Sequence, residues 1–77
     1  MMEILKFVEL VAEQFNETDR CEFTAETQFK QLKEWDSLIA LSIIGMVDEE
    51  YGITIQGEDI RNAGTINDLF IHVKAKQ

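Results

Sequence analysis

The residues best placed to do chemistry in this chain are the four consecutive residues Trp35-Asp36-Ser37-Leu38. They place a serine hydroxyl where a loop gives way to a strongly apolar helical pattern. The first backbone N–H groups of a helix lack intrahelical partners, and the helix dipole favours an anion at that end. A serine there therefore presents a free hydroxyl at a helix end that favours an incoming anion such as a phosphate.

Two other roles for Ser37 have to be weighed against this one. Serine is a favoured helix N-cap, so taken alone the residue is more often only a cap. A hydrolytic nucleophile would need a Gly-x-Ser-x-Gly elbow or a nearby base. The chain has no such elbow, and its one histidine, His72, lies in the last helical pattern with no obvious orienting acid. We therefore predict no catalytic residue and no enzymatic activity.

Length and composition favour one small domain that spans residues 1–77. With 77 residues, 45% of them hydrophobic, the chain can build one compact core and no second domain. The single Cys21 excludes an internal disulfide and a thiolate metal site, and no role is assigned to it. The acids at 48–50 and 58–59 lack the spacing of a calcium loop, so no metal site is expected. The first residues mix charges into an apolar run, which is typical of neither a signal peptide nor a membrane span. A cytoplasmic location is expected.

The charge of the chain argues against nucleic acid as a partner. Fifteen acidic residues face seven basic ones, for a net charge of −8, whereas phosphate backbones are neutralised by Lys and Arg. The segment that begins at Ser37 holds five acids and no Lys or Arg before residue 60: Asp48, Glu49, Glu50, Glu58 and Asp59. Such acids can simply solvate a helix face. Beside a candidate site, a docking surface for basic partners is the better interpretation.

Three amphipathic patterns predict long helices, and no proline interrupts them. The first runs from Ile4 to near Asn16. The second begins at Asp36 or Ser37, either of which can cap it, and ends at Gly52. Its predicted core side consists of Ala40, Ile43, Ile44, Val47 and Tyr51. The third runs through Ile66, Leu69, Phe70 and Val73, and Thr65 with Asp68 resembles a capping box before it.

The connecting segments are predicted to add short helical turns and no sheet. The loop from Asn16 to Trp35 is long for so small a domain. Its apolar residues can pin it to the core, and a helical turn is expected near 27–32: Phe23, Phe29, Leu32 and Trp35. Ile53-Thr54-Ile55 alternates like a strand but has no strand partner, so we expect an extended connector into a short helix around 58–62. The fold class is therefore all-α.

The motif and its context resemble the attachment site of the acyl carrier protein family. Asp36-Ser37-Leu38 carries the resemblance, together with length, acidity and helix order. The run from Val47 to Ile53 resembles the family's acidic end of the second helix with its aromatic anchor and turn. The resemblance implies a small four-helix bundle with a long first loop and a short third helix. It also implies 4'-phosphopantetheine on Ser37, moved from coenzyme A by a phosphopantetheinyl transferase, with acyl groups held as thioesters.

A partner surface is expected beside Ser37. Helical spacing places Leu38, Leu41, Gly45 and Asp48 on one stripe turned away from the core. Two leucines followed by Asp48 and Glu49 would make a small apolar patch with an acidic guide. The expected partners are acyl-loading and acyl-processing enzymes with basic docking patches. The chain is expected to be a monomer.

Some residues depart from the pattern of carriers that serve general fatty-acid synthesis. Such carriers usually place acids in the first turns after the Ser-Leu pair, where this chain has Ile39 and Ser42. Trp35 stands where a small residue is common. The departures favour a dedicated pathway of polyketide-like, aminoacyl or saccharide-modifying type, and the residues do not identify the cargo. The alternative is an unmodified acidic helical interaction domain with the same fold.

Overall fold

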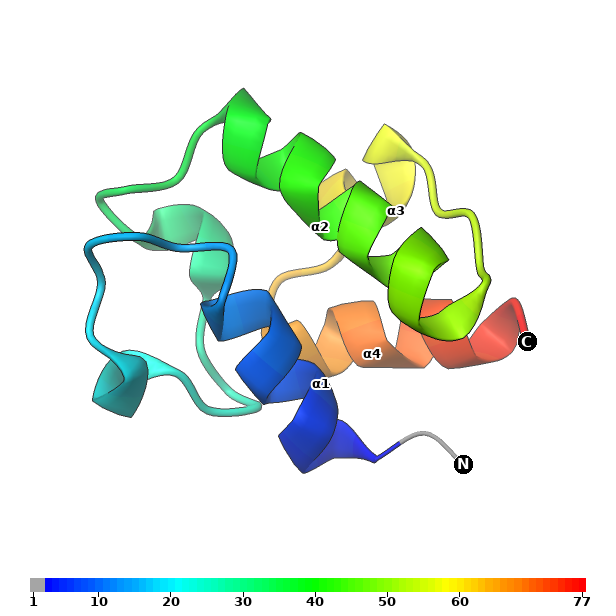
Figure 1. The fold of residues 1–77 in the computed structure, drawn as a ribbon, viewed down its shortest axis with the longest axis horizontal. Helices are drawn as coiled ribbons and strands as arrows, with labels where there is room; N and C mark the ends of the chain where they lie inside the picture. Colours follow the sequence, from blue (N-terminus) through cyan, green and yellow to red (C-terminus); the bar gives the residue numbers. More distant parts are fainter. Residues whose placement is uncertain (1–2) are drawn as a thin grey trace.

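The computed structural model describes residues 3–77, and this part of the chain is built from α-helices and loops with no β-strand (Figure 1). The four helices are α1 (Ile4–Ala12), α2 (Ser37–Tyr51), α3 (Gly57–Asn62) and α4 (Ile66–Ala75). Two 3-10 turns, η1 (Arg20–Glu22) and η2 (Phe29–Gln31), interrupt the long loop between α1 and α2. The all-α prediction, with a long first loop and a short third helix, is confirmed.

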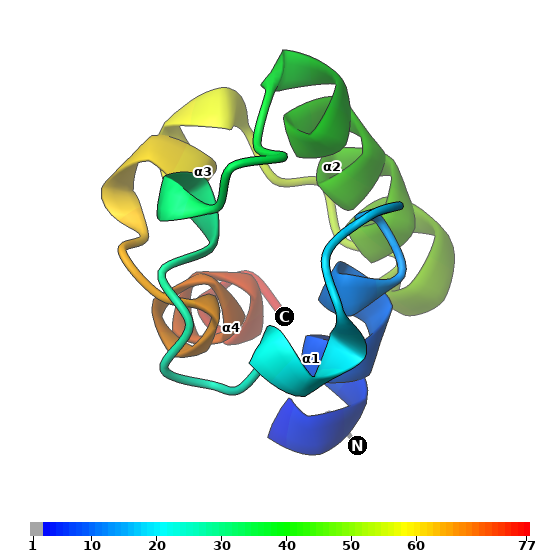
Figure 2. The same ribbon diagram turned by 90° about the vertical axis from the view of Figure 1, so that its left-hand side faces the viewer.

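The helices surround one core. α1 packs against α2 and α4, and α3 packs against α2 and α4. Figure 2 looks at the molecule from one end, where the long first loop lies in front of the helices. No helix within residues 3–77 has the length and apolar character needed to cross a bilayer.

The core draws on every helix and on the loops between them. Its largest side chains, each less than 2% exposed, are Phe7, Val11, Phe29, Ile43, Val47, Ile55, Ile66, Leu69 and Val73. Phe29 belongs to the first loop, where Phe23 is also buried and Leu32 and Trp35 pack partly buried against the core. The prediction that apolar side chains pin this loop is therefore confirmed.

The predicted core side of α2 is partly wrong. The buried residues are Ile39, Ile43, Met46 and Val47, whereas Ala40, Ile44 and Tyr51 are only partly buried. The first three turns of α2 are apolar on most sides, so periodicity alone does not decide which side faces inward. Contacts with α1 and α3 decide it, and they turn Ile39 and Met46 into the core.

The first helix ends earlier than predicted. α1 stops at Ala12, and the next amides bond three residues back, Gln14 N–H to the Val11 carbonyl and Phe15 N–H to the Ala12 carbonyl, both pairs being about 3 Å apart. This tighter turn still buries Phe15 at 6% exposure. The apolar pattern therefore continues past the end of the helix itself.

The predicted end of α2 and the predicted start of α4 are confirmed. Gly52 adopts φ +65°, the left-handed conformation that glycine favours, and its N–H donates to the Asp48 carbonyl at 2.9 Å. At α4, Asp68 N–H donates to Thr65 Oγ1 and Thr65 N–H donates to Asp68 Oδ2, each at 3.1 Å. The backbone N–H groups of Thr65 and Gly64 lower the pKa of Asp68.

The connector between α2 and α3 behaves as predicted. Ile53 and Ile55 are buried and Thr54 is exposed, without a strand partner in the described chain. The alternating pattern therefore marks an extended segment that covers the core from one side.

Candidate functional site

Ser37 is the first residue of α2, and Asp36 is its cap. Asp36 Oδ1 accepts the N–H of Ile39 at 2.9 Å, and the Asp36 carbonyl accepts the N–H of Ala40 at 3.2 Å. Of the two capping candidates, Asp36 therefore takes the structural task. Ser37 is exposed, and its hydroxyl makes no hydrogen bond within residues 3–77.

The backbone around Ser37 suits a phosphate group. The Asp36 carboxylate satisfies Ile39, and within the described chain the N–H groups of Ser37 and Leu38 have no acceptor. α2 is 15 residues long, so its N-terminus carries the positive end of a full helix dipole. A phosphodiester on Ser37 would lie at this end, where an anion is stabilised. The residues present therefore fit a phosphate-linked arm.

The loop that leads into α2 is anchored by Trp35. Its ring lies 5.3 Å from that of Phe29, edge-on, and 6.3 Å from that of Phe15, measured between centroids. Phe15 in turn contacts Phe23 at 5.0 Å. The sequence-based view of Trp35 as a core anchor rather than a ligand-stacking residue agrees with this packing.

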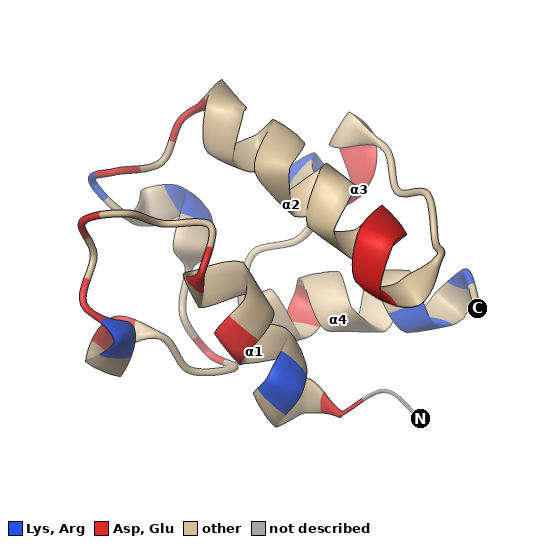
Figure 3. Ribbon diagram, viewed as in Figure 1, with Lys and Arg blue, Asp and Glu red and all other residues tan. Residues whose placement is uncertain are grey.

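An exposed stripe runs along α2 from the site. Leu38 and Leu41 are 71% and 63% exposed, and Gly45 and Asp48 are also on the surface. Glu49 is exposed and lines a shallow groove of about 410 Å³ between α1 and α2. Figure 3 shows the first half of α2 without charge and the acids gathered at its far end. The predicted apolar patch and acidic guide are thus both accessible.

Of the two α2 residues that the sequence analysis set apart from general fatty-acid carriers, Ile39 is buried and Ser42 is exposed. Ile39 is only 7% exposed and packs in the core, so it is not available to a partner. Ser42 is exposed and lines the groove between α1 and α2. Of these two positions, only Ser42 can therefore face a partner.

The structure contradicts two expectations about residues outside the site. His72 was expected to have no acidic neighbour, and Asp59 was grouped with the acids of a docking surface. Asp59 is buried at 9% exposure, and its Oδ2 accepts the N–H of Gln56 at 2.8 Å. His72 Nδ1 lies 3.6 Å from Asp59 Oδ1, so the histidine does have an acidic neighbour, and Lys76 Nζ lies 3.6 Å from Oδ2. The Gln56 N–H, then Lys76 and His72, lower the pKa of Asp59 despite its partial burial.

This cluster is structural rather than part of the site at Ser37. It joins α3 to the last turns of α4, and Figure 1 shows the end of α4 far from the start of α2. Its ionised Asp59 also holds the first turn of α3 through Gln56.

Comparison with known proteins identifies the family. A family model described as a phosphopantetheine attachment site matches residues 6–73. The chain belongs to the acyl carrier protein family. It is 29% identical to proteins named acyl carrier protein from Rickettsia typhi, Rickettsia prowazekii and Rickettsia canadensis, over 72 residues that cover 94% of this chain and 83% of each relative. No solved structure matches the chain.

Membership in the acyl carrier protein family defines the cofactor and the type of activity. Acyl carrier proteins hold 4'-phosphopantetheine covalently and are carriers rather than catalysts. They interact with a phosphopantetheinyl transferase and with acyl-processing enzymes. In this chain, Ser37 combines an exposed hydroxyl with an open helix N-terminus.

The sequence analysis missed Glu34, which lies three residues before Ser37. Its carboxylate accepts hydrogen bonds from residues 16–18, just after α1. The partners are 16 to 18 positions away, so no local pattern reveals them. A glutamate directly before Trp35 gives no sequence signal beyond its charge.

Proposed function

We propose that this chain tethers acyl intermediates as thioesters on a 4'-phosphopantetheine arm attached to Ser37. The observation that carries the proposal is that two adjacent residues have different roles at the start of α2. Asp36 caps the helix, so the adjacent hydroxyl of Ser37 stays exposed beside the N–H groups of Ser37 and Leu38. The family match supplies the cofactor, and this geometry supports Ser37 as its attachment point.

Attachment requires a nucleophile that the chain presents and a transferase that activates it. Ser37 Oγ forms a bond to the phosphorus that bears the pantetheine of coenzyme A, the bond from that phosphorus to the adenosine bisphosphate breaks, and the hydroxyl proton passes to a base of the transferase. The arm then supplies a terminal thiol for thioester formation. Asp36 caps α2, and the free N–H groups of Ser37 and Leu38 would face the phosphodiester at the helix end, where the dipole would stabilise its charge.

We further propose that the carrier serves a dedicated biosynthetic pathway rather than general fatty-acid synthesis. The support for this is the uncharged first half of α2, with exposed Ser42, and the confinement of the helix acids to residues 48–50. Partners of such a carrier would place basic patches against Asp48 and Glu49, beside an apolar contact with Leu38 and Leu41. The carrier itself would act as a monomer in the cytoplasm.

An unmodified interaction domain is the competing function, because the acidic face of α2 could bind partners without an arm. The two are separated by the intact mass of the protein after incubation with coenzyme A and a broad-specificity phosphopantetheinyl transferase. We expect the mass to increase by one phosphopantetheine group. An unchanged mass with several such transferases would replace the carrier with the interaction domain.

Charge reversal at the end of α2 tests the docking surface. We expect the double variant Asp48→Lys/Glu49→Lys to be modified about tenfold more slowly at low salt, since charge complementarity speeds association. The difference should shrink as salt is added, because screening weakens exposed charges. Stability should change little, because both residues are exposed. Initial modification rates across a salt series measure this.

The matched control is Glu9→Lys/Glu26→Lys, which changes the net charge equally at exposed positions on α1 and in the first loop. It should keep more of the parent rate than the α2 variant at every salt concentration. Equal slowing in both variants would mean that only net charge matters, and equal rates in all three proteins would leave the α2 acids as solubilising residues.

A further inference from the structure

Glu34 joins two distant parts of the first loop through its carboxylate. Oε2 accepts the N–H of Asn16 at 2.6 Å. Oε1 accepts the N–H groups of Glu17 and Thr18, each at 3.0 Å, and the Thr18 hydroxyl at 2.9 Å. We call this set of four hydrogen bonds the Glu34 latch.

The latch depends on the negative charge of the carboxylate. Partial burial opposes ionisation, but the N–H groups of Glu17, Asn16 and Thr18 together outweigh it and lower the pKa of Glu34. The side chain is therefore ionised near neutral pH, and its bonds are of the stronger, charge-assisted kind. A neutral side chain of the same size cannot accept at both oxygens.

The latch lies directly before the attachment residue. Three consecutive residues each fix the backbone in a different way: Glu34 binds residues 16–18, Trp35 packs on Phe29, and Asp36 caps α2. Trp35 and Asp36 act on the core and on α2 itself. Trp35 also reaches the buried Phe15 just after α1, and Glu34 adds hydrogen bonds to the next three residues, 16–18, of which Asn16 and Glu17 are exposed.

Local order is what the latch can control. Asn16 and Glu17 are exposed, and Thr18 and Glu34 are only partly buried. Loss of the latch therefore exposes no core side chain, but it frees the loop to sample other conformations. Ser37 lies only three residues after Glu34, so the conformation of this loop bears directly on the start of α2.

We propose that Glu34 is a positioning residue for arm attachment: by tying residues 16–18 to the loop that enters α2, it holds the Ser37 hydroxyl in the orientation that the transferase uses. This inference rests on the proposed attachment at Ser37. Glu34 would raise the fraction of molecules whose Ser37 hydroxyl is in the reactive orientation. It would make no contact with coenzyme A.

The test compares Glu34→Gln with the parent as substrates of a phosphopantetheinyl transferase. Glutamine keeps the size, but its amide nitrogen cannot accept the N–H of Asn16. We expect KM for the carrier to rise about fivefold with kcat nearly unchanged, because apparent affinity falls with the fraction of molecules in the competent conformation. Glu26→Gln is the matched control, an exposed glutamate of the same loop, and should keep the parent KM.

Backbone amide chemical shifts report the latch directly. In the parent, the amide protons of Asn16, Glu17 and Thr18 should shift together as the pH falls below the ordinary glutamate value of 4.5, when Glu34 takes up a proton. Glu34→Gln should lack this titration. Thr18→Val removes only the hydroxyl bond, so its KM should rise less than that of Glu34→Gln.

Each outcome decides a different claim. If Glu34→Gln folds, loses the amide titration and still has the parent KM and kcat, the latch is only structural and the inference is overturned. If the variant does not fold, the KM of Thr18→Val decides, and a value equal to the parent's overturns the inference as well. If the parent itself gains no arm, the proposed function fails instead.

Discussion

Ser37→Ala is expected to abolish the gain of phosphopantetheine while leaving the bundle folded. The variant lacks the only atom proposed to bond to phosphorus. It keeps the Asp36 cap, and alanine is the best helix former, so α2 should begin at the same residue. The position is exposed, and surface substitutions usually change stability by less than about 0.5 kcal/mol. Intact mass after transferase treatment, with circular dichroism of the same sample, measures both effects.

Ser42→Ala is the matched control. Ser42 is the only other serine in the chain and is exposed on the same helix. It lies more than a turn inside α2, where the backbone N–H groups are already bonded and no helix end receives a phosphate. This variant should be modified at the parent rate. Modification that persists in Ser37→Ala, or is lost in Ser42→Ala, would contradict the assignment of Ser37.

Local signals explain most of what the sequence revealed. Gly52 ends α2 because its left-handed conformation suits glycine, and Thr65 and Asp68 start α4 by bonding each other's backbone. The motif at Asp36 and Ser37 joins a cap to a free hydroxyl within two residues. Each of these features is complete within a few positions, so residue types and spacing are enough to find it.

Features that depend on distant partners were not visible in the same way. Glu34 and Asp59 look like ordinary surface acids, yet one accepts bonds from residues 16–18 and the other lies beside His72 and Lys76. The buried side of α2 differs from the prediction based on periodicity for a related reason. Its early turns are apolar nearly all round, so the neighbouring helices choose the buried face and bring Ile39 into the core. Tertiary packing therefore has to be known before such residues can be assigned.

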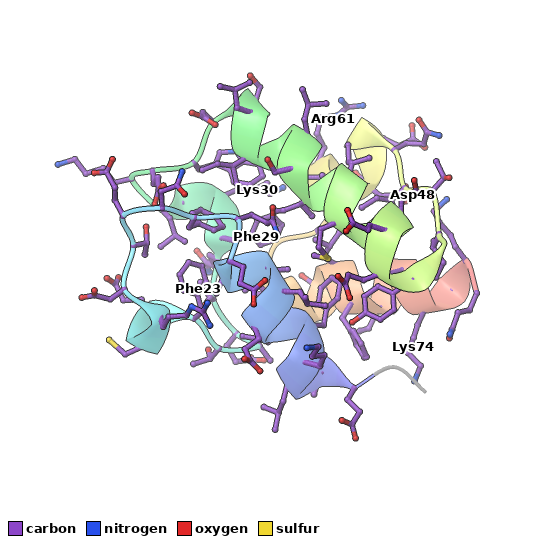
Figure 4. The ribbon with its side chains drawn as sticks, in the orientation of Figure 1. Phe23, Phe29, Lys30, Asp48, Arg61 and Lys74 are labelled. Atoms are coloured by element: carbon purple, nitrogen blue, oxygen red, sulfur yellow. The ribbon has the colours of Figure 1, made fainter. Side chains whose placement is uncertain are left out.

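Phe29→Ala is expected to destabilise the protein by about 3 to 5 kcal/mol, the usual cost of truncating a buried phenylalanine. Phe29 is fully buried although it lies in the first loop, and its ring packs edge-on against Trp35. Figure 4 shows it in the space between that loop and the helices. Small domains have a total stability of only about 5 to 15 kcal/mol, so this loss would take a large share of it. Urea unfolding followed by circular dichroism measures the difference.

Leu38→Ala is the control for Phe29→Ala, because it also truncates a large apolar side chain to alanine. Leu38 is 71% exposed, so its loss should change stability by less than about 0.5 kcal/mol. The contrast tests the claim that the long loop belongs to the core. If Phe29→Ala were as stable as the parent, Phe29 would not hold the loop. Its contact with Trp35 would then not explain how the residues before Ser37 are fixed. If the large cost is observed, the loop that delivers Ser37 to the start of α2 is held by the same core that holds the helices.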